Sequence, residues 1–213
     1  MLNEMTLSTV PTKHSSTAVG RRIWPVTTAV LAVTIFVTLL QFIFPQVLEL
    51  LKRRPGCLAA GEWWRIISPL FVHSMGWPGE ASRSSGHDAW KNLAHLVFNV
   101  AWIAYVGVVV ERLFGGTRWL VIYFISGVIG EFAGFAWKPD GAGASLGGSG
   151  LIGALCIWVI LVRPPQRWQF RLSGMLGLLG AAILCAVADL HGPPIFAGAL
   201  IAATMLWDDD RRR

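Results

Sequence analysis

Long apolar stretches separated by short polar joints dominate this sequence. The stretches are rich in Leu, Ile, Val, Phe and Ala, and the joints collect Arg, Lys, Asp, Gly and Pro. An α-helix needs about 20 mostly apolar residues to cross the hydrocarbon core of a bilayer, which is about 30 Å thick. The pattern therefore predicts six transmembrane helices, at 24–44, 93–110, 119–136, 149–162, 172–188 and 191–207.

The overall composition supports an all-α membrane protein. Of the 213 residues, 54% are hydrophobic and only 14% are charged, whereas soluble domains contain about 25% charged residues. Six spans leave no room for a second folded domain. We expect a disordered cytoplasmic tail at 1–22, a membrane domain at 23–207 and a charged cytoplasmic tail at 208–213.

Basic residues set the expected orientation of the helices. With the N-terminus inside, the inner segments carry more Lys and Arg than the outer ones, so the positive-inside rule places both termini in the cytoplasm. No targeting peptide is recognisable, and we expect a multi-pass protein of a bacterial cytoplasmic membrane. The basic clusters at 163–171 and 211–213 should contact membrane lipids, and no basic soluble surface suggests a nucleic-acid partner.

The first outer loop, at 45–91, is long and mixed in character. It is too polar to span a bilayer, but it contains several tryptophans, among them Trp64 beside Arg65. Tryptophan prefers the membrane–water interface. We therefore expect this loop to be half-embedded at the outer surface.

Four polar side chains stand in apolar segments at similar expected depths. Counting from the inner helix ends at about 1.5 Å per residue places His95, Asn99, Ser149 and His191 in one layer, roughly 16–22 Å above the inner boundary. The segment at 149–162 is too short to cross, so its start should lie below the outer surface where water reaches it. The positive end of that helix would favour an oxyanion near Ser149.

These residue types suit hydrolysis of an acyl bond. A histidine can take the proton of a serine hydroxyl and later donate it to a leaving amine. His95 and Asn99 are four residues apart and share a helix face, and both can donate hydrogen bonds to an oxyanion together with backbone N–H groups near Ser149. A serine and a histidine at these depths, such as Ser149 and His191, are therefore suited to this chemistry.

The order of several motifs resembles the rhomboid intramembrane serine proteases. The motifs are Gly-x-Ser-Gly at 147–150, His-x-x-x-Asn at 95–99, Trp64-Arg65 in the first outer loop, Glu111-Arg112 followed by Gly115, and a histidine seven residues before Gly198. The resemblance implies a six-helix rhomboid-like bundle over nearly the whole chain. It implies no metal and no cofactor, and it leaves the oligomeric state open.

The resemblance also assigns roles residue by residue. It implies Ser149 and His191 as the catalytic pair, with His95, Asn99 and the Ser149 amide forming the oxyanion hole. The substrates would be single-span membrane proteins cut near the outer membrane boundary. Residues expected to support the site structurally are Gly147, Gly150, Trp64, Arg65, Glu111 and Gly198.

The sequence departs from the family pattern just after the histidine. Rhomboids usually have a glycine three residues after the catalytic histidine, but here Pro193-Pro194 occupies that stretch. Proline suits the first turn of a helix and not its interior, so His191 should lie just before the last helix. If the imidazole then misses the serine, the chain would be a catalytically inactive rhomboid-fold protein that binds transmembrane clients.

Two further alternatives remain open. The segment 143–147 also matches the Gly-x-Ser-x-Gly elbow of α/β-hydrolases at Ser145, but that motif requires a preceding strand that the sequence does not predict. A small transporter could use Glu131, His95 and Asp189 as a proton path, although inverted repeats are not visible. We favour Ser149 as the nucleophile, and we expect Glu131 to pair with an Arg or His of a loop.

Overall fold

The computed structural model describes residues 24–73, 86–162 and 168–212, and the regular elements within these ranges are helices joined by short loops. The expected tail at 1–22 lies outside the described residues. The all-α class is confirmed. The elements are α1 (Pro25–Ile43), α2 (Gln46–Leu51), α3 (Pro55–Ala59), the 3-10 helices η1 (Trp63–Ile66) and η2 (Ser68–Phe71), α4 (Gly86–Phe114), α5 (Gly116–Trp137), α6 (Ser145–Leu161), α7 (Trp168–Ala186) and α8 (Gly192–Arg211).

Length and hydropathy qualify several helices as membrane spans. Among the described residues, four helices are long and apolar enough to cross a bilayer: α1, the Leu93–Phe114 part of α4, α5 and α7. Helix α6 is apolar but shorter, and α8 is not among the four. The expected boundaries fall within a few residues of those of α1, α5 and α7.

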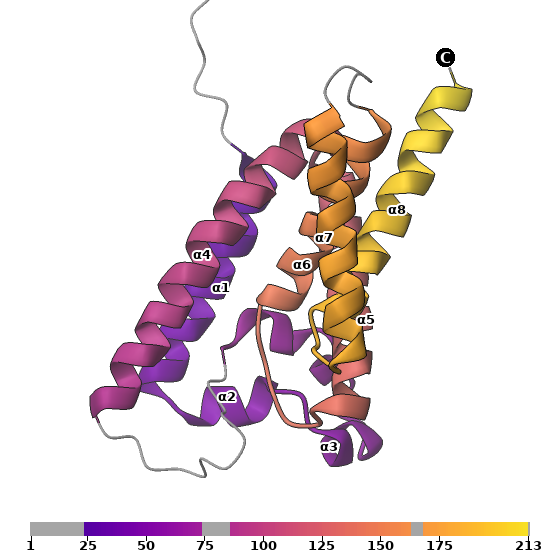
Figure 1. Ribbon diagram of the computed structural model, residues 1–213. Coiled ribbons are helices and arrows are strands. Elements are labelled where there is room, and N and C mark those ends of the chain that lie inside the picture. The colour runs from indigo at the N-terminus through magenta and orange to yellow at the C-terminus, as the bar shows by residue number, and fades with distance from the viewer. Residues whose placement is uncertain (1–23, 74–85, 163–167, 213) are drawn as a thin grey trace, which may run out of the picture.

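Helix α6 lies at the centre of the bundle. It packs against α4, α5, α7 and α8, and its buried Leu151 and Ala154 belong to the same core cluster as Trp119 and Tyr123 of α5. Figure 1 shows α1 and α4 running side by side, with α7 and α8 on the other side of α6. Helix α6 begins part-way along the bundle, so its first residues lie inside the protein.

The start of α6 differs from the sequence expectation. The helix begins at Ser145 rather than at residue 149. Gly147 and Gly150 lie within this helix, and neighbouring side chains occupy the space that a Cβ atom would need at both positions. A Cβ at Gly147 would lie 2.5 Å from the Tyr123 ring, and one at Gly150 would lie 2.3 Å from Ser126 Cβ.

Helix α8 begins as the proline pair predicts and ends later than expected. His191 is its N-cap residue, and Pro193-Pro194 fall in the first turn, where backbone N–H groups lack intrahelical acceptors anyway. The helix continues through Arg211. Arg118 binds the Asp209 carboxylate with both terminal nitrogens at 2.6 Å, so part of the expected tail at 208–213 is helical and attached to α5.

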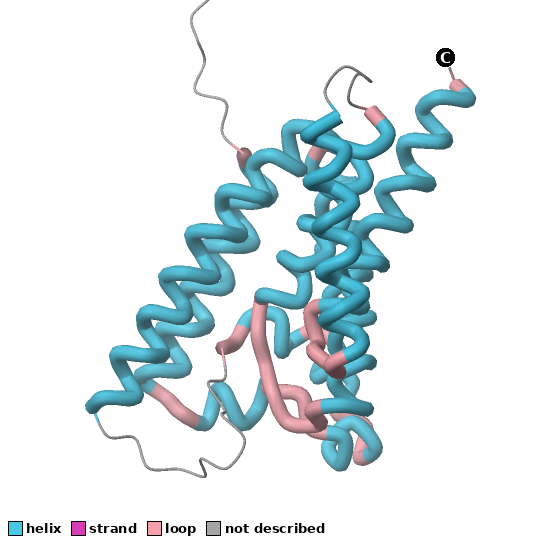
Figure 2. The backbone as a smooth tube through the Cα atoms, in the orientation of Figure 1, coloured by secondary structure: helices cyan, strands magenta, loops and turns pink. Residues whose placement is uncertain are grey.

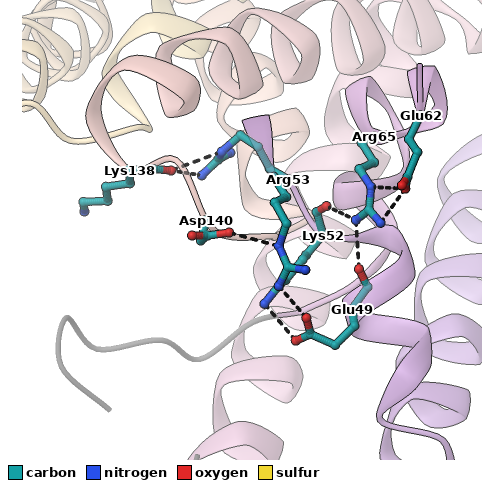
Figure 3. Close-up of polar contacts among 8 residues, drawn as sticks. Glu49, Lys52, Arg53, Glu62, Arg65, Lys138 and Asp140 are labelled. Atoms are coloured by element: carbon teal, nitrogen blue, oxygen red, sulfur yellow. Dashed lines mark hydrogen bonds and ion pairs between the residues drawn. The ribbon is translucent and has the colours of Figure 1, made fainter. Parts of the chain in front are cut away.

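The described part of the first outer loop, residues 45–73, forms the short helices α2, α3, η1 and η2 beside the lower half of the bundle as drawn (Figure 2). The buried Arg65 organises it by donating to the backbone carbonyls of Glu49 and Lys52, both at 2.8 Å, and by pairing with Glu62 (Figure 3). Trp64 is half-exposed, and its Nε1 donates to the Leu50 carbonyl at 3.1 Å. Both residues thus stabilise the loop from within it.

The Glu111 side chain links α4 to the start of α1 by hydrogen bonds. Its carboxylate accepts the backbone N–H groups of Val26 at 3.0 Å and Thr27 at 2.8 Å, and the Thr27 hydroxyl at 2.6 Å. These are N–H groups that the first turn of a helix cannot satisfy internally. A carboxylate at this position also complements the positive end of the helix dipole.

The close contact between α6 and α8 leads us to expect that a side chain at Gly198 lowers the stability of the protein. A Cβ there would lie 1.9 Å from the Gly150 carbonyl oxygen, so Gly198→Ala must push two backbones apart. We expect this overpacking to lower the free energy of unfolding by about 1–3 kcal/mol, measured by thermal denaturation in detergent. Gly180→Ala is the control, because nothing lies within 4 Å of a Cβ at that position. Equal stability of the two variants would contradict the packing argument.

Candidate active site

Three polar side chains form a hydrogen-bonded series where the turn between α7 and α8 meets the start of α6. The Nε2 atom of His191 lies 3.0 Å from Ser145 Oγ. The Nδ1 atom of the same ring lies 2.6 Å from Asp189 Oδ1. The backbone N–H of His191 also donates to Asp189 Oδ1, at 2.9 Å. The proline pair therefore does not turn the imidazole away from the serine helix.

Ser145 is held in place from the first outer loop. It follows a connecting segment, 138–144, that hydrogen-bonds to this loop at two points. The Arg53 N–H donates to the Gly141 carbonyl at 2.8 Å, and the Gly143 N–H donates to the Pro69 carbonyl at 2.9 Å. The Arg53 guanidinium in addition donates to the Lys138 carbonyl (Figure 3). The start of α6 is thus fixed by residues distant in sequence.

The structure corrects the expected partner of His191. Ser149 lies one helical turn after Ser145 on the same face of α6, and both line one cavity, but the Nε2 atom of the imidazole contacts Ser145. As the fifth residue of α6, Ser149 directs its N–H to the Ser145 carbonyl within the helix. Its amide is therefore not free to bind an oxyanion, which contradicts that part of our expectation.

Asn99 has an orientation that its neighbours determine. The indole Nε1 of Trp102, which can only donate, contacts Asn99 Oδ1 at 3.0 Å. The amide nitrogen must then be on the other side, where it donates to the His95 carbonyl at 3.0 Å. An amide nitrogen carries two hydrogens, and within the described part of the chain the second has no protein acceptor.

His95 and Asn99 face the same cavity as the two serines and His191. This open cavity has a volume of about 580 Å³ and is lined by side chains of α4, α6 and α8 together with Leu184 of α7. Most of its lining is apolar, including Phe98 and Ile195. A smaller hollow of about 190 Å³ also reaches Ser145 and His191, and its lining includes Lys138 and Asp140.

His73 and Asp189 lie near the site, outside the spanning helices, and both have shifted pKa values. Burial, and secondarily the neighbouring His95, lower the pKa of His73 to about 4, and the His73 and His95 rings meet edge to face at 6.0 Å between centroids. Burial raises the pKa of Asp189, but hydrogen bonds from His191 outweigh it and hold that pKa below its usual value. Asp189 is therefore anionic at neutral pH, and His73 is neutral.

Glu131 pairs with a loop arginine. Its carboxylate contacts the Arg53 guanidinium, and both side chains are buried. Arg53 reaches it across Gly134, where a Cβ would overlap the guanidinium. The ion pair attaches the first outer loop to α5. Within the described ranges, no three His, Cys, Asp or Glu side chains gather in the manner of a metal site.

Comparison with known families matches residues 89–206, slightly more than half of the chain, to the Rhomboid domain. The chain belongs to the rhomboid family. It is therefore a multi-pass integral membrane protein of a family that contains serine proteases. The matched region includes α5, α6, α7 and nearly all of α4 and α8, and so contains every member of the Ser145–His191–Asp189 series.

Curated rhomboids resemble this chain over part of their length. The rhomboid protease GluP of Bacillus subtilis is 36% identical over 99 residues, which cover 46% of this chain and 16% of the relative. The putative rhomboid protease YdcA of the same organism is 29% identical over 130 residues, covering 60% and 56%. The inactive RHOMBOID-like protein 8 of Arabidopsis thaliana is 31% identical over 96 residues, covering 44% and 22%. The chain thus spans less than two thirds of the length of each.

The sequence contained signals for the two residues that our reasoning placed elsewhere. Ser145 is flanked by Gly143 and Gly147, and Asp189 stands two residues before the histidine. We assigned the first to a soluble-enzyme motif, and we considered the second only as a helix joint or part of a proton path. Neither assignment considered the turn that brings both side chains to one imidazole.

Proposed function

We propose that this rhomboid is an intramembrane serine endopeptidase in which Ser145 is the nucleophile and His191 the general base and acid. The observation that carries the proposal is the 3.0 Å contact between Ser145 Oγ and His191 Nε2, a distance suited to proton transfer between them. It replaces Ser149, our sequence-based choice, with the serine one turn nearer the start of α6.

The proposed reaction proceeds through an acyl-enzyme. Ser145 Oγ attacks the carbonyl carbon of the scissile peptide bond while its proton moves to His191 Nε2. The carbon–nitrogen bond then breaks, and the imidazolium returns the proton to the departing amine. A water molecule, deprotonated by His191, hydrolyses the Ser145 ester and restores the hydroxyl. The smaller hollow beside Ser145 and His191, whose lining includes Lys138 and Asp140, offers that water a route to the ester.

Three groups are suited to stabilise the oxyanion. Among the residues that the structure describes, the second N–H of the Asn99 amide meets no acceptor, and His95 faces the same cavity. Ser145 supplies a backbone N–H from the first turn of α6, where such groups lack intrahelical partners. The partial positive charge at the start of α6 acts in the same direction. Each donor of this kind contributes about 3–4 kcal/mol to transition-state stabilisation in comparable hydrolases.

Transmembrane proteins are the proposed substrates. The 580 Å³ cavity lies among α4, α6, α7 and α8 and has a largely apolar lining, and Phe98 on its rim is 67% exposed. A membrane helix approaching between α4 and α7 would meet an apolar surface first and the polar Ser145 afterwards. We propose that all of α1, α4, α5, α6, α7 and α8 cross the membrane, with both termini cytoplasmic and cleavage near the outer boundary.

A fluorophosphonate probe tests which serine is activated. We expect the purified wild-type protein to form a covalent adduct that peptide mass spectrometry locates on Ser145. Labelling should persist in Ser149→Ala and disappear in Ser145→Ala and His191→Ala. An adduct on Ser149, or a folded wild-type protein that the probe never labels, would overturn the proposal.

An inactive rhomboid that binds transmembrane clients is the second candidate. The observation that favours it is the similarity to a relative named inactive, and the absence of the family glycine where Pro194 stands points the same way. This candidate requires that a single-span reporter crosslinks to the wild-type protein and to Ser145→Ala equally, without cleavage by either. Cleavage by the wild-type protein alone would exclude it.

A further inference from the structure

We propose that Asp189 is a positioning residue that fixes the tautomer and orientation of His191, so that the site operates as a Ser145–His191–Asp189 triad. The inference rests on the proposed function for its role in catalysis. The geometry that carries it is the double contact of one carboxylate oxygen, Asp189 Oδ1, with the Nδ1 atom of His191 at 2.6 Å and with its backbone nitrogen at 2.9 Å.

The chemistry of the carboxylate determines where the imidazole proton resides. An ionised carboxylate can only accept hydrogen bonds, so the Nδ1 atom that it contacts must carry a hydrogen. A neutral imidazole then has its lone pair on Nε2, which faces Ser145 Oγ at 3.0 Å. This is the tautomer that accepts the serine proton. A histidine without a fixed Nδ1 partner would divide its population between two tautomers, one of which cannot act as base.

The backbone of the turn brings Asp189 to this position. Helix α7 ends with hydrogen bonds from the Asp189 N–H to the Leu184 carbonyl at 2.8 Å and from the Ala188 N–H to the Cys185 carbonyl at 3.1 Å, the pattern of a Schellman turn. Ala188 has φ of 54°, a left-handed conformation that usually requires glycine. The turn therefore keeps a strained residue directly before Asp189.

A lysine that follows α5 lies near the other carboxylate oxygen of Asp189. Lys138, which follows α5, has its Nζ 4.0 Å from Asp189 Oδ2, leaving Oδ1 for His191. His191 is thus faced by Asp189 from its own turn and by Ser145 from α6, with His95 of α4 across the shared cavity. Of the charged groups in this arrangement, the anion in hydrogen-bond contact with the imidazole is Asp189. It stabilises the imidazolium that forms when Ser145 attacks.

Two variants separate the charge of Asp189 from its hydrogen bonds. Asp189→Ala removes both, and we expect kcat for a single-span reporter to fall by about 10²–10⁴-fold with KM little changed. Asp189→Asn can keep an oxygen facing the two donors of His191, so its loss of kcat should be smaller.

In Asp189→Asn the acid limb of the kcat/KM profile should move to lower pH, because an imidazolium without its anion loses its proton more readily. Asp208→Asn, far from the site and paired with Arg212, should match the wild type.

A measurement without turnover keeps this inference separate from the proposed function. Nitrogen NMR of ¹⁵N-labelled imidazoles should show His191 in the Nδ1–H form in the wild-type protein and a mixture of tautomers in Asp189→Ala. Wild-type kcat and an unchanged pH profile in both Asp189 variants, or an Nε2–H tautomer in the wild type, would overturn the role of Asp189. If the wild type neither cleaves nor is labelled, proteolysis fails as a function while the tautomer still decides the positioning role.

Discussion

Replacing Ser145 with alanine is expected to lower the cleavage rate of a single-span reporter by about 10⁴-fold or more. Loss of the nucleophile from a Ser–His unit removes the covalent pathway, and only the binding and oxyanion contributions remain. Cleavage would be followed in proteoliposomes by the appearance of the two reporter fragments. His191→Ala should cause a loss of similar size, since the two residues act as one unit.

Ser149→Ala is the matched control for this prediction. It removes an identical hydroxyl from the same face of α6, one turn deeper, and leaves the Ser145–His191 contact intact. We expect its rate to remain within about tenfold of the wild-type rate, because the Ser149 N–H bonds within the helix and its hydroxyl does not meet the imidazole. A complete loss in Ser149→Ala, with activity retained in Ser145→Ala, would restore the sequence-based assignment.

Arg53→Met is expected to produce the largest loss of stability. The Arg53 guanidinium and the Glu131 carboxylate are both buried, and removing one partner of such a pair leaves an uncompensated buried charge, which costs about 3–5 kcal/mol. Arg53 also donates to the Lys138 carbonyl at 2.7 Å, so that acceptor is left unpaired too. Denaturant unfolding in detergent micelles measures the effect.

The neighbouring arginine provides the control. Arg54 pairs with Glu49 and Asp140 at a much more exposed position, and exposed pairs contribute about 0–1 kcal/mol, so Arg54→Met should change stability little. The double variant Arg53→Met with Glu131→Leu should recover part of the loss, because it removes both charges. Equal stability of Arg53→Met and Arg54→Met would show that the buried pair does not hold the first outer loop on α5.

Hydropathy alone was enough to predict the helical class and the approximate position of most long helices. The reason is physical, because lipid requires each spanning segment to satisfy its own backbone hydrogen bonds over about 20 apolar residues. The proline pair likewise indicated that His191 stands just before α8, since proline is confined to the first turn of a helix. The family resemblance drew on motif order, and the Rhomboid domain match confirms it.

Local sequence pattern could not determine which serine of α6 meets His191. The predicted span begins after Gly147, but Gly147 and Gly150 both lie inside α6, with Tyr123 and Ser126 of α5 in the space beside them. That shift of one turn moves the helix start from residue 149 to Ser145. Ser145 and Ser149 are four residues apart and share one face of α6, and the position of His191 at the start of α8 decides which of them the imidazole meets.

The sequence by itself determined a helical membrane protein of the rhomboid family, with a serine, two histidines and an asparagine in a common layer. These follow from composition, segment length and motif order, which are local properties of the chain. The tertiary structure decided that Ser145 meets His191 Nε2, that Asp189 contacts the Nδ1 atom of the same imidazole, and that Arg53 reaches Glu131. Such contacts join residues as far apart as 53 and 131, and they depend on how turns and helix packing bring distant segments together.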